Sequence, residues 1–213
     1  MTIRRILDFL AEIRIMPVVV IDDAALAPEV AAALSAGGIR CAEITLRTPA
    51  GLRSLEAVAG IPEFIVGAGT VLTADHVDRC VDAGAEFIVS PGFDEEVVER
   101  AQHHGIAVLP GIATATEIQR ALRAGLDTVK FFPADRLGGL DTIRSLASPF
   151  PDLRFVPSGG VTRDNALGYL AHPAVPTVSG SWMVTRELIR AREFARIERL
   201  STEASTLFAG TES

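Results

Sequence analysis

Residues 127–134 read DTVKFFPA, and this stretch gives the first indication of the fold. It is a short run of valine and phenylalanine closed by a proline, which predicts a buried strand rather than a helix. A strand buried on both faces should be continuously apolar, so Lys130 in its middle needs an explanation. Either the amine reaches water at the strand end, or it is held for chemistry. Apolar surroundings favour the neutral form of an amine, and a neutral amine attacks carbonyl groups to form a Schiff base.

The same pattern recurs on both sides of this stretch at intervals of roughly 20 residues: a β-rich run, a polar or glycine turn, an amphipathic helix and a glycine stop. We expect strands at residues 16–21, 40–46, 64–66, 87–89, 107–109, 128–132, 154–156 and 177–178. We expect helices at residues 3–13, 26–36, 49–59, 73–83, 95–104, 116–124, 140–148, 165–171 and 187–200. Gly84, Gly105 and Gly125 stand where a helix end needs a residue that tolerates positive φ.

Eight predicted strands that alternate with helices indicate an α/β fold with a parallel sheet, and eight strands close a (β/α)8 TIM barrel. We expect a single barrel domain over residues 1–213, with an extra leading helix in residues 1–15 and a partly disordered tail in residues 201–213. An open doubly wound sheet is the alternative. The first predicted strand is not followed by GxGxxG, which weakens that alternative.

Composition narrows the class of protein. The chain of 213 residues is 48% hydrophobic and 22% charged, which is typical of a globular protein. Its net charge of -7 argues against a nucleic-acid partner, because binding phosphate backbones needs a basic face. Cys41 and Cys80 form no CxxC motif, which favours a reduced, cytoplasmic setting. The N-terminal stretch lacks the uninterrupted apolar run of a signal peptide or membrane span, so we expect no membrane association.

Polar and unusual residues cluster at the predicted carboxyl ends of the strands, where barrels of this kind build their active sites. Glu43 interrupts an apolar strand, and a buried carboxyl group suits either proton transfer beside Lys130 or a structural ion pair. Arg47 offers a planar donor pair that matches a carboxylate, although an exposed arginine at a helix start is the simpler interpretation. Thr70 closes GAGT, where glycines let a ligand approach the backbone.

Glycine-rich turns follow the last two predicted strands. They read PSGG (157–160) and SGS (179–181), and their backbone N–H groups could hold a phosphate. Metal binding is not indicated, because the four histidines lie in helices or loops without HxH or HExxH spacing.

Taken together, EITLRT, GAGTVL, SPG, VKFFPA, PSGG and GSW, in this order between about residues 16 and 182, resemble the 2-keto-3-deoxy-6-phosphogluconate/4-hydroxy-2-oxoglutarate aldolase family. The resemblance implies a class I aldolase that needs no cofactor or metal, forms a (β/α)8 barrel and assembles as a homotrimer. It also implies roles for individual residues. Lys130 corresponds to the Schiff-base lysine and Glu43 to the general acid/base.

The remaining site residues follow from the same resemblance. Arg47 and Thr70 correspond to the groups that hold the pyruvate carboxylate, and Pro91 and Phe132 to walls of the site. The residues that correspond to the phosphate end are Ser158, Gly159, Gly160, Gly180 and Ser181. Two positions depart from the family pattern: Asp135 stands where Glu is common, and Ser158 stands where Thr is common before the paired glycines.

The implied reaction cleaves 2-keto-3-deoxy-6-phosphogluconate reversibly to pyruvate and D-glyceraldehyde 3-phosphate, with 4-hydroxy-2-oxoglutarate as a further substrate. Three alternatives stay open at this point. They are an aldolase for the galactonate-derived stereoisomer or for 4-hydroxy-2-oxoglutarate alone, a metal-dependent aldolase, and a non-catalytic phosphosugar-binding barrel in which Lys130 only clamps charge.

Overall fold

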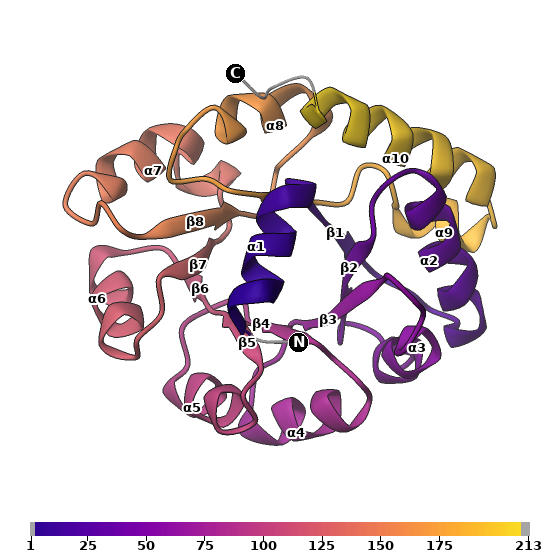
Figure 1. Ribbon diagram of the computed structural model, residues 1–213, viewed down its shortest axis with the longest axis horizontal. Coiled ribbons are helices and arrows are strands. Elements are labelled where there is room, and N and C mark those ends of the chain that lie inside the picture. Colours follow the sequence, from indigo (N-terminus) through magenta and orange to yellow (C-terminus); the bar gives the residue numbers. More distant parts are fainter. Residues whose placement is uncertain (1–2, 210–213) are drawn as a thin grey trace.

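The structure, a computed structural model, describes residues 3–209. Strands lie in the middle of the molecule and helices surround them (Figure 1). The strands are β1 (Ile15–Val19), β2 (Cys41–Thr45), β3 (Ile65–Gly69), β4 (Phe87–Val89), β5 (Ala107–Leu109), β6 (Gly111–Ile112), β7 (Thr128–Phe131), β8 (Arg154–Pro157) and β9 (Val178–Gly180). The helices are α1 (Ile3–Ile13), α2 (Ala27–Ala36), α3 (Gly51–Val58), α4 (Ala74–Asp82), α5 (Glu95–His103), α6 (Ala115–Arg123), α7 (Gly139–Ala147), α8 (Arg163–Leu170), α9 (Arg186–Arg190) and α10 (Phe194–Ala209), with 3₁₀ turns η1 (Ala24–Leu26) and η2 (Asp135–Leu137).

The strands pair in parallel and form two sheets. One has the order β5-β4-β3-β2-β1-β9 and the other the order β6-β7-β8. Pro110 separates β5 from β6, and because proline has no N–H to donate, the ladder is interrupted there. The Pro110 carbonyl still accepts the backbone N–H of Lys130 at 2.9 Å. At the other edge, an isolated parallel bridge between Ser158 and Ser179 connects β8 with β9.

This arrangement confirms the predicted α/β class with parallel strands. The first and last strands, β1 and β9, are neighbours, an order that differs from that of an open doubly wound sheet. The strands are divided between two sheets rather than forming the predicted single eight-stranded sheet. The division falls where Pro110 cannot donate a ladder hydrogen bond and where β8 and β9 share a single bridge.

Most predicted elements are present, with ends that differ by a few residues. The short strand β6 was not predicted, because Gly111 and Ile112 carry almost no pattern of their own. The predicted helix at 187–200 is two helices, α9 and α10, and Arg192 between them has a φ of 55°.

The expectation of a disordered tail from residue 201 is wrong as far as residue 209, because α10 continues to Ala209. Ser201 and Ala204 are buried, and Ser205 Oγ donates a hydrogen bond to the carbonyl of Gly37 at 2.8 Å. These contacts hold the end of α10 against α2. Residues 210–213 of the predicted tail lie outside the described residues.

Local sequence explains where the helices begin and end. Thr114 and Glu117 form a capping box at the start of α6, in which the side chain of each residue accepts a hydrogen bond from the backbone N–H of the other. Gly84, Gly105 and Gly125 all have positive φ after α4, α5 and α6, as predicted. Among residues 3–209, no helix is both long and apolar enough to span a membrane.

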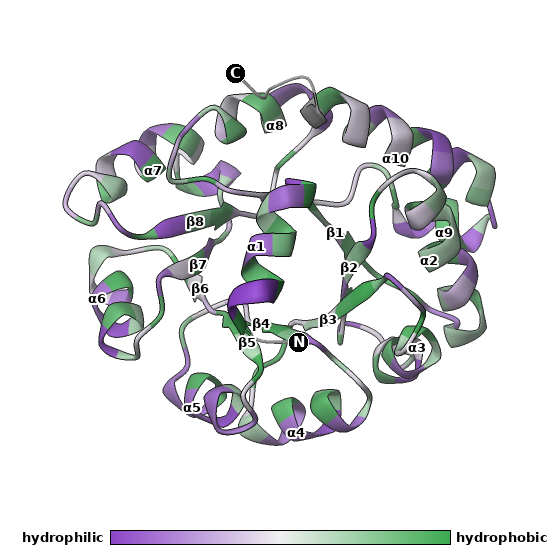
Figure 2. Cartoon of the chain, in the orientation of Figure 1, coloured by the Kyte–Doolittle hydropathy of each residue, from purple (hydrophilic) through white to green (hydrophobic). Residues whose placement is uncertain are grey.

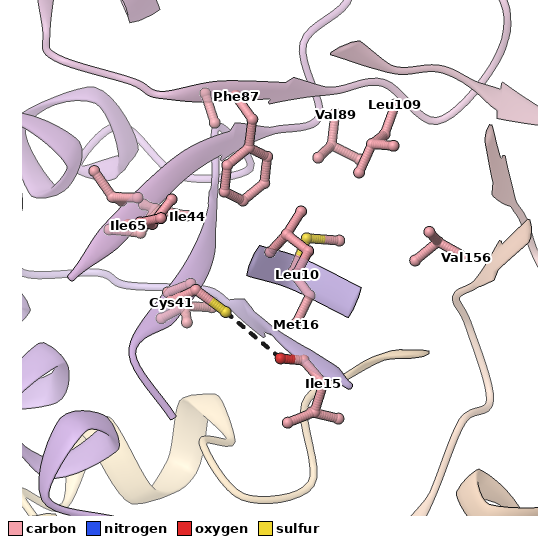
Figure 3. Packing of buried hydrophobic residues seen from close by; sticks show 14 of the residues in the cluster. Leu10, Ile15, Met16, Cys41, Ile44, Ile65, Phe87, Val89, Leu109 and Val156 are labelled. Atoms are coloured by element: carbon pink, nitrogen blue, oxygen red, sulfur yellow. Dashed lines mark hydrogen bonds between the residues drawn. The ribbon is translucent and has the colours of Figure 1, made fainter. Parts of the chain in front are cut away.

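Helix α1 lies across the middle of the ring of strands (Figure 1). Its Phe9 ring lies 5.6 Å from the guanidinium carbon of Arg40, which directly precedes β2, so α1 covers the amino-terminal ends of the strands. Leu10 points inward toward Met16, with Val156 on the far side of the interior (Figure 3). The strands are mostly hydrophobic, whereas the helices carry hydrophilic residues on their outer turns (Figure 2). This packing fills the interior at the amino-terminal ends of the strands. It leaves the carboxyl ends of the strands available for a site.

Candidate active site

A cavity of about 280 Å³ opens at the carboxyl ends of the strands. All of the predicted site residues line it: Lys130, Glu43, Arg47, Thr70, Pro91, Phe132, Ser158, Gly159, Gly160, Gly180 and Ser181. Three residues that were not predicted also line it, Val18, Thr45 and Val161, together with Ser179, which was predicted only as part of the SGS turn. The position of the cavity agrees with the general rule that parallel α/β sheets bind ligands at the carboxyl ends of their strands.

Lys130 and Glu43 meet inside this cavity. The Lys130 Nζ atom lies 3.3 Å from Glu43 Oε1 and donates a hydrogen bond to it, and the two residues are 6% and 1% exposed. The second carboxyl oxygen of Glu43, Oε2, is buried and has no hydrogen-bond partner among residues 3–209. The pair is therefore enclosed by protein, and the carboxyl group keeps a free oxygen that can exchange a proton with a ligand or a water molecule.

The backbone makes room for this pair. Gly69 ends β3 beside β2, and a Cβ atom built on it would lie 2.2 Å from Glu43 Oε1. Only glycine therefore fits beside the carboxyl group in this position. On the other side, the Phe132 ring lies with its centroid 5.3 Å from Lys130 Nζ, which is within the range of a cation–π contact.

Arg47 is fixed at the rim through a hydrogen-bond chain. Its Nε–H donates to Thr45 Oγ1 at 3.3 Å, and Thr45 Oγ1 donates to the carbonyl of Val19 at 3.0 Å. Thr45 is 1% exposed, so the end of β1 holds the guanidinium through a buried hydroxyl group. A side-chain pattern could have identified Thr45, because it follows Glu43 by two residues and such residues share a face of a strand.

Thr70 has a φ of 60°, in the left-handed region. A β-branched residue is a genuine outlier there, and such strain is concentrated at functional sites. The position adds weight to the prediction that Thr70 contacts a ligand.

The predicted phosphate end is built from close approaches of backbone to side chains. Gly160 has a φ of 78°, and a Cβ atom on it would lie 2.1 Å from Asp135 Cβ. A Cβ atom on Gly180 would lie 2.2 Å from the Trp182 ring. Both positions therefore require glycine. Because glycine has no side chain, the backbone N–H and C=O groups along this part of the cavity wall stay accessible to a ligand.

The histidines and cysteines lie elsewhere. No group of three or more His, Cys, Asp or Glu residues within residues 3–209 is placed to hold a metal ion. Cys41 donates its thiol to the carbonyl of Ile15 at 3.5 Å (Figure 3), and burial raises its pKa to about 12. Burial likewise raises the pKa of Cys80 to about 11. Both thiols are therefore structural rather than reactive.

Breaking the bond between the α and β carbons of a carbonyl compound requires a group that accepts the electron pair, and the imine formed with a lysine is such a group. Lys130 sits in an enclosed cavity with a carboxyl group next to it, where that chemistry can occur. Fold and site together indicate a carbon–carbon lyase, an aldolase.

Comparison with known proteins gives the family. The family model described as KDPG and KHG aldolase matches residues 6–200, and the chain belongs to this family. A relative from Treponema pallidum (strain Nichols), named 2-dehydro-3-deoxy-phosphogluconate aldolase, is 45% identical over 202 residues, which cover 93% of this chain and 95% of the relative.

Two solved structures are similar throughout. The 2-keto-3-deoxy-6-phosphogluconate aldolase of Zymomonas mobilis ZM4 with 3-phosphoglycerate has a TM-score of 0.89 and 42% identity, covering 94% of this chain and 95% of that chain. The KDPG aldolase of Legionella pneumophila, with pyruvate captured at low pH as a covalent carbinolamine intermediate, has a TM-score of 0.87 and 37% identity, covering 90% of this chain and 93% of that chain.

Proposed function

We propose that this aldolase cleaves 2-keto-3-deoxy-6-phosphogluconate reversibly to pyruvate and D-glyceraldehyde 3-phosphate, through a Schiff base on Lys130. The observation that carries the proposal is the enclosed pair of Lys130 Nζ and Glu43 Oε1, 3.3 Å apart, in the cavity at the carboxyl ends of the strands. The relatives named for this activity, and the carbinolamine of pyruvate in the Legionella structure, support the same chemistry here.

The first half of the reaction builds the imine. Lys130 Nζ, after passing a proton to Glu43, attacks the C2 keto carbon of the substrate and forms a carbinolamine. Glu43 then returns the proton to the alkoxide oxygen and relays a second proton from the carbinolamine nitrogen to the same oxygen, and water leaves to give the protonated imine. The distance between the two side chains allows this transfer directly or through one water molecule.

The second half breaks the bond. Removal of the proton from the C4 hydroxyl group lets the C3–C4 electron pair move into the imine, which releases the aldehyde and leaves an enamine on Lys130. Protonation of the enamine at C3 gives the imine of pyruvate. Water adds to that imine, and pyruvate leaves as the free amine of Lys130 is restored.

The cavity walls orient the substrate for these steps. We assign binding of the carboxylate next to the reacting carbon to Arg47, held by Thr45, and to Thr70, and their position in the cavity lining supports this. The glycine-rich walls after β8 and β9 offer backbone N–H groups to the phosphate, together with Ser158 and Ser181. Binding at both ends holds the keto carbon near the amine, which is the main contribution of such groups to rate.

Because the family also covers KHG aldolase, 4-hydroxy-2-oxoglutarate is a second candidate substrate, cleaved to pyruvate and glyoxylate. The same amine and carboxyl group serve both substrates. Comparison of kcat/KM for the two compounds, and for the galactonate-derived stereoisomer, measures the preference.

We also propose that β5 and β6 act as one strand, so that eight strands close into a (β/α)8 barrel that forms a single domain. The carbonyl of Pro110 and the bridge between Ser158 and Ser179 support this closure. The resemblance to the family further suggests a homotrimer in the cytoplasm, and analytical ultracentrifugation tests the trimer.

The test of the proposed function is chemical trapping. Lys130 is the only lysine in the sequence, so the N-terminus is the one other primary amine. Incubation with pyruvate and sodium borohydride should convert Lys130 to its N-carboxyethyl derivative, detected by peptide mass spectrometry, and should abolish cleavage.

The matched control is Lys130→Met, which keeps the length of the side chain and removes the amine. It should give no adduct and no cleavage while keeping the fold by circular dichroism. An unmodified Lys130 in wild-type protein that still binds the phosphorylated substrate would indicate the non-catalytic phosphosugar-binding barrel instead.

A further inference from the structure

Ser179 in β9 carries a buried hydroxyl group to which the proposed reaction assigns no role. Its Oγ atom is buried and has no hydrogen-bond partner among residues 3–209, and the residue is 1% exposed. Burying a hydroxyl group without a partner costs free energy, so such a group calls for an explanation.

The strand register shows where this hydroxyl group lies. Ser179 is level with Met16 on β1 and with Ser158 after β8, and residues paired in this way share a face. Met16 and Val156 point into the interior (Figure 3), and Ser158 follows Val156 by two residues, so it shares that face. Ser179 therefore faces the interior, and it lines the same cavity as Lys130.

The register also places Ser179 beside the proposed phosphate end, one strand beyond β8 from the amine. Lys130 on β7 is level with Val156 on β8, and the next inward residue, Ser158, is level with Ser179 on β9. A substrate bound to Lys130 must pass over β8 to reach the wall formed by Gly180 and Ser181. Ser179 lies deeper than that wall, because it precedes both residues along the strand and is buried, whereas Ser181 is exposed.

We propose that Ser179 Oγ hydrogen-bonds the hydroxyl group on carbon 5 of the six-carbon substrate, which becomes carbon 2 of the released aldehyde. This inference rests on the proposed function. A serine hydroxyl group both donates and accepts, which suits an alcohol partner. The carbon-4 oxygen has to lie near the proton acceptor beside Lys130, and the carboxylate lies toward Arg47, which leaves the carbon-5 hydroxyl group for the β9 side.

The test compares two aldehydes in condensation with pyruvate. One is D-glyceraldehyde 3-phosphate, and the other is 3-oxopropyl phosphate, which has the same length but lacks the hydroxyl group in question. Loss of one neutral hydrogen bond corresponds to roughly a two- to tenfold change. Ser179→Ala should therefore lower kcat/KM for glyceraldehyde 3-phosphate by that factor, and should change kcat/KM for 3-oxopropyl phosphate less than twofold.

Ser201→Ala is the matched control, because Ser201 Oγ is also buried without a hydrogen-bond partner in the described chain but lies on α10, outside the cavity. It should leave the ratio of the two kcat/KM values as in wild type. Ser179→Cys, which keeps the size and weakens the donor, should give a smaller loss of the same selectivity, and it replaces Ser179→Ala if that variant does not fold.

Equal losses for both aldehydes, or no loss for either, would overturn the role of Ser179. The proposed function is checked separately by exchange of the methyl protons of pyruvate in D₂O by the wild-type enzyme, which needs Lys130 and no aldehyde. If that exchange is absent, the proposed function fails, and if it is present, a negative result with Ser179→Ala concerns Ser179 alone.

Discussion

At the scale of single residues, Gly69 controls the room available to the Glu43 carboxyl group. A methyl group at this position would lie 2.2 Å from Glu43 Oε1, and the φ of Gly69 is outside the left-handed region, so the backbone itself accepts alanine. Gly69→Ala should push Glu43 away from Lys130. General acid–base catalysis contributes about 10²- to 10⁴-fold, so we expect kcat for substrate cleavage to fall at least tenfold.

Steady-state kinetics measure this effect, with circular dichroism as the check on folding. Gly92→Ala is the control, because Gly92 follows β4 at the same end of the molecule and has open space around the added methyl group. It should keep the kcat of the wild type. A Gly69→Ala enzyme with an unchanged kcat would show that Glu43 does not need its present position.

The predicted site residues line one cavity because most of them lie at, or just beyond, the carboxyl end of a predicted strand, with Glu43 and Lys130 inside their strands. Chain order in a parallel α/β protein brings these ends together, whatever the details of packing. Thr45 was not predicted, and Ser179 was predicted only as part of the SGS turn, without a role for its side chain. Alternation along β2 could have identified Thr45, whereas the inward direction of Ser179 depends on its register with Met16 and Ser158, which the sequence does not reveal.

At the scale of elements, Asp78 ties α4 to α5. Both nitrogens of the Arg100 fork donate to its carboxylate, at 2.6 and 2.9 Å, and His104 Nε2 lies 2.6 Å from it. Hydrogen bonds from Arg100 and then from His104 lower the pKa of Asp78 to about 2. Because this pKa is depressed on folding, the contribution to stability is present above the unfolded value near 3.8 and is lost as the pH falls through about 2.

Asp78→Asn should therefore lower the melting temperature at pH 6, and the difference from wild type should shrink as the pH falls from about 4 to 2. Thermal unfolding followed by circular dichroism at several pH values measures this. Asp82→Asn, an exposed position at the end of the same helix, is the control and should change the melting temperature less at pH 6. A difference that stays constant over the whole pH range would contradict the assignment.

Elements with strong local signals were predicted, and those fixed by tertiary contact were not. Thr114 and Glu117, which form a capping box, are a local sequence signal for the start of α6. In contrast, β6 consists of Gly111 and Ile112, which become a strand only because β7 lies beside them. The break before α10 depends on the positive φ of Arg192. Arginine rarely adopts this conformation, so its presence in the sequence does not predict the break.

At the scale of the whole molecule, α10 closes the outer layer of helices by packing on α2. Ala204 is 1% exposed and Ser201 is fully buried, while a Cβ atom on Gly37 would lie 2.3 Å from Ser201 Cβ. Ala204→Arg should therefore separate the two helices and lower the free energy of unfolding by about 1–3 kcal/mol.

Chemical denaturation measures this free energy. Thr206→Arg places the same side chain on the exposed face of α10 and should change the free energy of unfolding by less than about 0.5 kcal/mol. Equal destabilisation by both variants would mean that this part of α10 does not pack on α2 in solution. The polar sequence after residue 200 had suggested disorder because the few buried positions of this last segment are small residues, which give little hydrophobic periodicity.

Helix α1, with Leu10 directed toward Met16, seals the opposite end of the ring of strands. We therefore expect substrate and products to pass through the cavity at the carboxyl ends of the strands. In the proposed binding mode, the aldehyde fragment lies toward the glycine-rich wall, between the cavity mouth and the pyruvate still attached to Lys130. We therefore expect sequential release, with the aldehyde first and the keto acid second, and in the synthetic direction we expect pyruvate to enter before its partner.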